Sequence, residues 1–204
     1  MKIGIIGAGN VGGALGKASV RAGHTVAISA EDPEHAATVA KEVGARGARS
    51  NQEAVADAEV VILAVPFEAI AGILKELGAA AHNKVIVDVS NRFAGDQLGA
   101  PSNAEQVQKM TKAPVIKAFN TIFASHQADP KVDGVALDGF VAGDDAGAKR
   151  TGLALVESLG FKPIDAGPLA MARALEGMGT LNIALNMSNG WPWQSGWKLL
   201  GPTG

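Results

Sequence analysis

Short apolar runs alternate with longer amphipathic stretches through most of the chain. Each short run, such as residues 2–7, is bounded by glycine, proline or polar residues, which is typical of a buried β-strand. We expect strands at residues 2–7, 25–28, 46–49, 59–65, 84–89, 115–119, 139–142 and 161–164. The stretches between them have helical spacing at residues 11–22, 33–43, 51–57, 67–80 and 144–159, with Asn51 as an N-cap. This alternation predicts an α/β fold of the Rossmann type, with a doubly wound, mostly parallel sheet.

The alternation stops after residues 166–168. One long helix is expected from Leu169 to about Met187, followed by a tail that carries Trp191, Trp193 and Trp197. We therefore divide the chain into a Rossmann domain at residues 1–165 and a short C-terminal helical segment with a Trp-rich tail at residues 166–204.

Composition and charge narrow the classes of function. The 204 residues are 47% hydrophobic and 19% charged, which is enough apolar material for a full core. A net charge of −2 argues against nucleic acid or an anionic membrane as the main partner. The absence of cysteine excludes disulfides and thiolate chemistry, and no histidine pair has metal-ligand spacing, so no metal site is expected. No stretch resembles a membrane span or a signal peptide, so we expect a cytoplasmic protein.

A glycine-rich motif joins the first expected strand to the first expected helix. It consists of Gly7, Ala8, Gly9, Asn10, Val11 and Gly12, in the pattern G-x-G-x-x-G. Gly7 allows a tight turn, Gly9 lets the backbone approach a pyrophosphate, and Gly12 lets helix and strand pack closely. The free N–H groups and the dipole at the helix start favour an anion. The motif in this position predicts a nicotinamide dinucleotide site, the alternative being a glycine turn without a ligand.

The end of the second strand bears on the choice between NAD and NADP. The residues there are Ser29, Ala30, Glu31 and Asp32. An acidic residue about 20 positions beyond the loop accepts the ribose 2′-OH of NAD, and it repels the 2′-phosphate of NADP. Glu31 is the first candidate and Asp32 the second, unless both acids only charge the first turn of the next helix. Because Arg46 and Arg49 could return to a 2′-phosphate from the following strand, both cofactors stay open.

The carboxyl ends of the later strands should face the nicotinamide ring, since ligands of open α/β sheets bind there. The fourth strand ends in the small residues Ala64, Val65 and Pro66, which leave room for a flat ring. Polar side chains follow the fifth and sixth strands at Ser90, Asn91, Asn120 and Thr121. We expect these side chains to converge near the reactive face, although Asn91 and Asn120 could instead make only turns or caps.

Lys117 is the candidate acid or anion-binding group in the sixth strand. Strand alternation puts it on the same face as Phe119, which we expect in the core. A partly buried lysine paired with Asp88 or a helix end is the interpretation that we favour. No residue is therefore assigned a catalytic role.

Seven segments, taken in order, resemble the NADP oxidoreductases that depend on the deazaflavin coenzyme F420. They are GAGNVGGAL at residues 7–15, AVPFEAI at 64–70, DVSN at 88–91, VIKAFNTI at 115–122, VAGDD at 141–145, DAGPL at 165–169 and RALE at 173–176. The same segments are similar to the cytosolic reductase domain of the six-transmembrane metalloreductases. The resemblance implies a Rossmann domain, a homodimer, and direct hydride transfer between nicotinamide and a flavin or deazaflavin ring. Such transfer needs close stacking of two rings rather than an acid–base residue.

The resemblance also assigns roles to residues. It implies that Gly7, Gly9, Asn10, Val11 and Gly12 hold the pyrophosphate, and that Ala64, Val65 and Pro66 flank the nicotinamide and its ribose. In the deazaflavin enzymes Ser-Arg-Arg follows the second strand and grips the 2′-phosphate. The matching residues here are Ser29, Ala30 and Glu31, which favours NAD or the use of both cofactors and weakens the assignment of F420 as partner.

The expected function is thus NAD(P)-dependent oxidation and reduction of a small-molecule substrate with a flavin-like acceptor. Exposed tryptophans would form a sticky patch, so we expect segment 166–204 to make the dimer contact and to roof the substrate pocket, unless it only packs within the chain. Two other functions stay open: reduction of a small carbonyl or imine, and a non-catalytic dinucleotide sensor or subunit. The β-hydroxyacid and pyrroline-carboxylate type reductases usually carry a longer helical domain, for which residues 166–204 leave little room.

Overall fold

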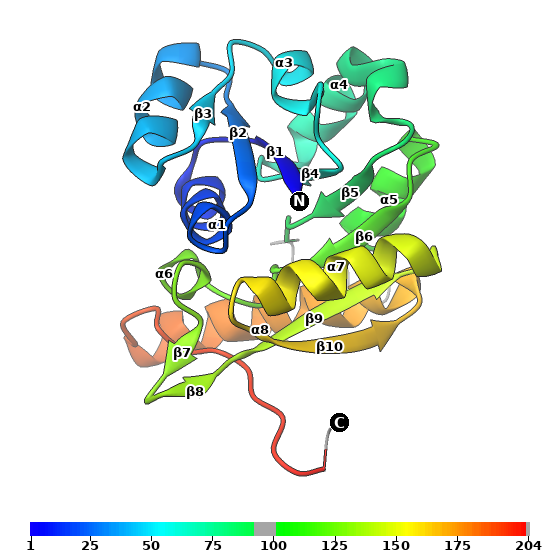
Figure 1. Ribbon diagram of the computed structural model, residues 1–204. Coiled ribbons are helices and arrows are strands. Elements are labelled where there is room, and N and C mark those ends of the chain that lie inside the picture. The colour runs from blue at the N-terminus through cyan, green and yellow to red at the C-terminus, as the bar shows by residue number, and fades with distance from the viewer. Residues whose placement is uncertain (92–100, 203–204) are drawn as a thin grey trace.

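The computed structural model describes residues 1–91 and 101–202, shown in Figure 1. Within them, an eight-stranded sheet has the order β10-β9-β6-β5-β4-β1-β2-β3, and β7 and β8 form a separate hairpin. The strands are β1 (Lys2–Ile6), β2 (Thr25–Ser29), β3 (Arg46–Gly47), β4 (Val60–Leu63), β5 (Val85–Asp88), β6 (Val115–Ala118), β7 (Lys131–Val132), β8 (Val135–Ala136), β9 (Asp138–Gly143) and β10 (Lys162–Gly167). The strands from β1 to β6 in the sheet pair in parallel, which confirms the predicted Rossmann-type α/β fold.

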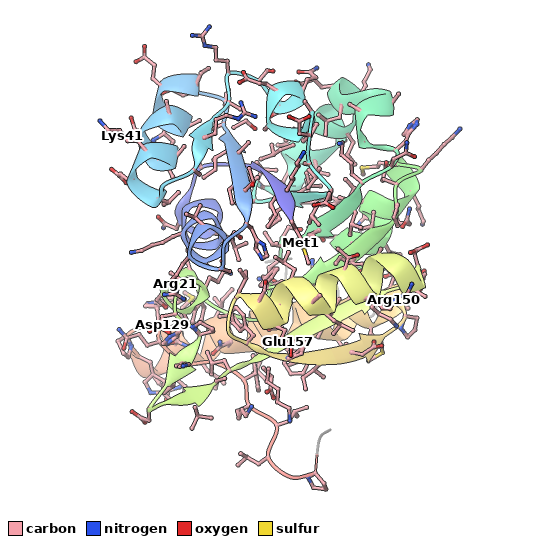
Figure 2. The ribbon with its side chains drawn as sticks, viewed as in Figure 1. Met1, Arg21, Lys41, Asp129, Arg150 and Glu157 are labelled. Carbon is pink, nitrogen blue, oxygen red and sulfur yellow. The ribbon has the colours of Figure 1, made fainter. Side chains whose placement is uncertain are left out.

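Helices cover both faces of this sheet. They are α1 (Asn10–Arg21), α2 (Pro33–Val43), α3 (Asn51–Val55), α4 (Phe67–Leu77), α5 (Asn103–Met110), α6 (Ala124–Gln127), α7 (Ala146–Ser158) and α8 (Ala172–Asn189), with 3-10 turns η1 (Gly78–Ala81) and η2 (Leu169–Met171). One core cluster joins the sheet to α1, α2 and α7, and a second joins it to α3, α4 and α5. Charged side chains such as Lys41 on α2 and Arg150 and Glu157 on α7 lie on the outside (Figure 2).

The sheet changes direction at β9. β9 pairs antiparallel with β6, and β10 runs parallel to β9, so the last two strands oppose the first six. Side chains of β9 alternate between the two faces of the sheet. Val141 lies in the core under α7, and Phe140 and Ala142 pack with Leu175 of α8 on the other face. α8 therefore lies across the sheet on the side opposite to α7, as Figure 1 shows.

Several local predictions need correction. The N-cap of α3 is Ser50, whose side chain accepts a hydrogen bond from the Glu53 N–H, and not Asn51. The long C-terminal helix begins only at Ala172, after the turn η2, and extends to Asn189. α5, α6 and the β7–β8 hairpin were not predicted. β10 continues to Gly167, three residues past the predicted end of that strand at residue 164.

The three tryptophans of the tail differ in burial. Trp197 packs against the small cluster between β9 and α8, whereas Trp191 and Trp193 stay 43% and 44% exposed. Packing within the chain thus leaves more than two fifths of the surface of Trp191 and of Trp193 exposed. Trp193 makes an edge contact with Phe123, with ring centroids 5.3 Å apart.

Neither a membrane-spanning helix nor a metal-binding cluster occurs among the described residues. Outside residues 92–100 and 203–204, no helix is both long and apolar enough to cross a membrane. In the same part of the chain, no cluster of three or more His, Cys, Asp or Glu side chains is arranged to hold a metal ion.

Candidate functional site

The loop between β1 and α1 contains two glycines that the fold itself requires. Gly7 has a φ of 110°, and a Cβ there would collide with the carbonyl oxygen of Ala64. A Cβ on Gly12 would collide with the carbonyl oxygen of Gly7. Gly9 differs, because nothing lies within 4 Å of the position its Cβ would take. Packing explains Gly7 and Gly12, but only the approach of something outside the fold would require a glycine at position 9.

The start of α1 has no side-chain cap. Gly9 is the N-cap residue, no side chain bonds to the first turn, and that turn contains no acidic residue. Some other helix starts have such a cap, for example Asp32 in α2 and Asp145 in α7, whereas α4, α6 and α8 lack one as α1 does. An uncapped, partly exposed first turn offers its N–H groups and its positive dipole end to an anion. Asn10 and Val11 occupy this turn, and Ala8 lies just before it.

The turn after β2 lies against this loop. The Gly7 N–H donates to the Ser29 carbonyl at 2.8 Å, and a nitrogen of the His35 ring lies 3.1 Å from the Ala8 carbonyl oxygen. Ser29 itself is fully buried, with its hydroxyl donating to Asn51 Oδ1 at 2.9 Å. Ala30 is half-buried and Glu31 is exposed. The structure therefore leaves Glu31, rather than Ser29, as the accessible polar side chain of the three.

The β4 end lies on the other side of the glycine loop. Ala64 and Val65 are half-buried and approach Gly7 so closely that a side chain there would strike both residues. Pro66 is exposed and occupies the N-cap position of α4. The structure thus places these three residues beside the glycine loop, at the edge where the parallel strands end.

The polar residues after β5 and β6 come together. The Asn91 amide donates to the Asn120 carbonyl at 2.7 Å, and the Asn120 amide donates to Asn91 Oδ1 and the Leu175 carbonyl, both at 2.8 Å. Ser90 accepts a hydrogen bond from the Asn103 side chain at 3.0 Å. The buried Oδ1 of Asn120 has no partner among the residues that the structure describes. A buried amide oxygen without a hydrogen-bond partner is uncommon in a folded protein.

Beneath this network lies a buried ion cluster. Lys117 Nζ donates to Asp88 Oδ2 at 2.7 Å, to Glu176 Oε1 at 2.8 Å and to the Ser90 carbonyl at 2.6 Å. The lysine and aspartate side chains are fully buried, which confirms the predicted pairing with Asp88. Burial raises the pKa of Glu176, and the ammonium of Lys117 opposes that rise. With two carboxylates as partners, this lysine is a structural cation rather than an exposed acid.

Two features of this region differ from the sequence-based expectation. Phe119 adopts a φ of 62°, which breaks strand alternation, so its ring enters the core under α7 while Lys117 points to the opposite face. The prediction that the two share a face was therefore wrong. Glu176 was missed as a partner, although it is the only acidic residue of α8 and so the one carboxylate which that helix could supply.

α8 passes directly over the polar strand ends. A Cβ on Gly179 would lie 2.6 Å from Asn91 Oδ1, and Glu176 also accepts the Asn103 N–H at 2.8 Å. The helix thus has small residues where it meets Asn91 and a carboxylate where it meets Lys117. These contacts anchor segment 169–189 across the carboxyl edge of the sheet.

Comparisons with known proteins converge on one group. A family model described as "NADP oxidoreductase coenzyme F420-dependent" matches residues 2–92. The F420-dependent NADP reductase of Methanothermobacter marburgensis is 32% identical over 213 residues, covering 93% of this chain and 94% of the relative. A solved structure of a proposed F420-dependent NADP reductase from Arthrobacter sp. FB24 has a TM-score of 0.86 at 28% identity, and covers 98% of this chain and 100% of that one.

Two further matches cover other reductases. The metalloreductase STEAP3 of Rattus norvegicus is 33% identical over 178 residues, and the chain spans about a third of that relative, 36% of its length. A Streptomyces aurantiacus imine reductase has a TM-score of 0.73 at 19% identity, which reflects a shared fold alone.

Proposed function

The chain belongs to the family of coenzyme F420-dependent NADP oxidoreductases, and from this premise we propose that it transfers a hydride between a nicotinamide dinucleotide and a deazaflavin of the F420 type. The observation that carries the proposal is Gly9. It stands at the uncapped start of α1 with open space where a side chain would lie, beside two glycines that the fold needs for its own packing. A pyrophosphate is the ligand which such a loop accommodates in this fold.

The loop residues would bind the pyrophosphate mainly through the backbone. Residues 7–12 present N–H groups at the start of α1, and no acidic side chain in the first turn competes for them. The named relatives use NADP, and the present site would hold NADP(H) or NAD(H), since both share this pyrophosphate. The difference between them lies at the turn after β2.

The nicotinamide end would lie between the β4 end and the polar strand ends. Ala64, Val65 and Pro66 offer a small apolar wall, which suits the face of a flat ring. The polar strand ends contribute Asn120, whose buried Oδ1 has no partner among the described residues. Asn91 fixes Asn120 through two hydrogen bonds, and so sets the direction of that oxygen.

Hydride transfer requires the protein to position the two rings rather than to transfer a proton. When bound, the nicotinamide supplies a hydride to the deazaflavin ring, which also takes one proton from solvent. The chain's part is to hold two rings face to face and to exclude water. Lys117 is buried against Asp88 and Glu176, so it is not placed to deliver a proton. This arrangement agrees with a site that has no assigned catalytic residue.

Segment 166–204 would act as a roof and as a contact between two copies of the chain. α8 already covers Asn91 and Asn120, and the exposed Trp191 and Trp193 lie beyond its end. Burial of such side chains in a homodimer would remove apolar surface from water. We place the protein in the cytoplasm, where the nicotinamide dinucleotides are available.

The test compares two glycine substitutions. Gly9→Ala fits the extended backbone at this position and meets no protein atom, so it should leave folding intact while obstructing the pyrophosphate. Gly72→Ala on α4 is the matched control, because its Cβ also enters open space, away from the loop. We expect Gly9→Ala to weaken dinucleotide binding at least tenfold and to slow F420 reduction, and the control to match the unaltered protein. Equal binding by both variants would exclude the loop as the dinucleotide site.

A further inference from the structure

The turn after β2 has two exposed carboxylates, and one of them is engaged in a helix cap. Asp32 is engaged as the N-cap of α2, where its Oδ1 accepts the Glu34 N–H at 2.9 Å. Ser29 is buried, and its hydroxyl is directed to Asn51. Glu31 is exposed, and its carboxylate makes no hydrogen bond or ion pair within the part of the chain that the structure describes. The two acids, which the sequence alone does not distinguish, thus differ in the structure. Asp32 caps α2, whereas Glu31 is exposed and, among the described residues, unengaged.

Glu31 stands where an adenosine ribose would arrive. The Ser29 carbonyl is bonded to the Gly7 N–H, so the turn and the phosphate loop are held side by side. The His35–Ala8 contact fixes α2 against the same loop. In a Rossmann fold the ribose next to the pyrophosphate reaches the end of β2, and a carboxylate there accepts its hydroxyl groups.

The side chain of Arg46 is engaged by another carboxylate, that of Glu53. Arg46 Nη1 lies 2.6 Å from Glu53 Oε1, and its Nη2 donates to the Glu53 carbonyl at 3.1 Å. The other oxygen of Glu53 accepts the backbone N–H of Arg49 at 2.9 Å. The Arg49 N–H and then the charge of Arg46 lower the pKa of Glu53, so this carboxylate stays ionised and holds its partners. A 2′-phosphate would have to compete with Glu53 for Arg46, and it would also meet Glu31.

We propose that Glu31 recognises the 2′-hydroxyl of the adenosine ribose, so that this protein binds NAD(H) more tightly than NADP(H). The proposal rests on the dinucleotide site proposed above, and it departs from the cofactor that the relatives' names carry. The preference should be roughly ten- to hundredfold, the range expected from one charge-assisted hydrogen bond gained and one repulsion avoided.

Equilibrium titrations with NADH and with NADPH, at one fixed ionic strength, test the proposal without any electron acceptor. The variant is Glu31→Gln, and the matched control is Glu34→Gln, which removes an exposed charge from the adjoining first turn of α2. We expect the unaltered protein and the control to prefer NADH. Glu31→Gln should lose about tenfold in NADH affinity and bind NADPH better, because the acceptor and the repulsion both weaken.

Arg49→Gln completes the test, because the guanidinium of Arg49 is the remaining cation of this region. We expect it to leave the NADH to NADPH ratio within about twofold. Tighter binding of NADPH by the unaltered protein, an unchanged ratio in Glu31→Gln, or a selective loss of NADPH in Arg49→Gln would each overturn the inference while the dinucleotide site stands. Binding of neither nucleotide would instead refute the proposed function itself.

Discussion

Removing the ammonium of Lys117 should lower the free energy of unfolding substantially at neutral pH. Lys117→Met keeps the length of the side chain but leaves Asp88 and Glu176 facing each other without a cation. The Lys117 and Asp88 side chains are 0% exposed and that of Glu176 is 5% exposed, so water cannot take the place of the ammonium. Removal of one partner from a buried ion pair costs about 3–5 kcal/mol. Because whole domains are stable by about 5–15 kcal/mol, this loss is readily measured.

The loss should also depend on pH, with a defined sign. Burial already raises the pKa of Glu176 above its usual 4.5, and Lys117 works against that rise. Without Lys117 the pKa of Glu176 in the folded state should rise further. A carboxyl group whose folded pKa is raised contributes stability below its unfolded pKa and loses it as pH increases through the folded pKa. The variant should therefore recover part of its deficit when the pH falls from 8 to 5.

Urea unfolding followed by tryptophan fluorescence at pH 5 and pH 8 measures both effects. The control is Lys117→Met combined with Glu176→Gln, in which the second buried charge is gone and the pH dependence of the deficit should shrink. A deficit under about 1 kcal/mol at pH 8 would refute the assignment of Lys117 as a buried structural cation. An equal deficit at both pH values would refute the role given to Glu176.

Three further substitutions probe the loop, the acid stability and the roof. Gly12→Ala should lower the free energy of unfolding by about 1–3 kcal/mol in urea titrations, because its Cβ would strike a backbone carbonyl of the phosphate loop. Arg173 lowers the pKa of Glu105 to about 2, so the stability from Glu105 is present above about pH 4.5 and lost as pH falls toward 2. Glu105→Gln should flatten that acid limb in unfolding curves, and an unchanged limb would contradict the pairing. Gly179→Ala should push α8 away from Asn91 and slow hydride transfer, as steady-state kinetics would show.

Local patterns were enough to predict the strands of the first half of the chain. Except for β3, each is a short apolar run, such as Val60–Leu63, and its position depends little on distant contacts. The direction of β9 was not predictable, because an apolar run looks the same in either orientation and the pairing with β6 is a tertiary fact. α5 has a local signal in the sequence, the capping box of Ser102 and Glu105, although the helix was not predicted.

The candidate site divides in the same way. The glycine motif is a local signal that the sequence shows directly. The structure adds that packing requires a glycine at positions 7 and 12 but not at position 9. The Lys117–Glu176 contact joins residues 59 positions apart in the chain, so no spacing rule points to it. The distinct tasks of Glu31 and Asp32 likewise depend on where α2 begins, which helix boundaries in a sequence fix only loosely.

Transfer of an isotope tests the central claim most directly. A nicotinamide dinucleotide with deuterium at the transferable ring position would be mixed with the protein and F420, and the reduced acceptor examined by mass spectrometry. If the protein holds the two rings face to face, the deuterium should appear on the deazaflavin, one for each dinucleotide oxidised and without exchange with solvent. Reduced acceptor without the label, or no reduction with either NADH or NADPH, would contradict direct hydride transfer.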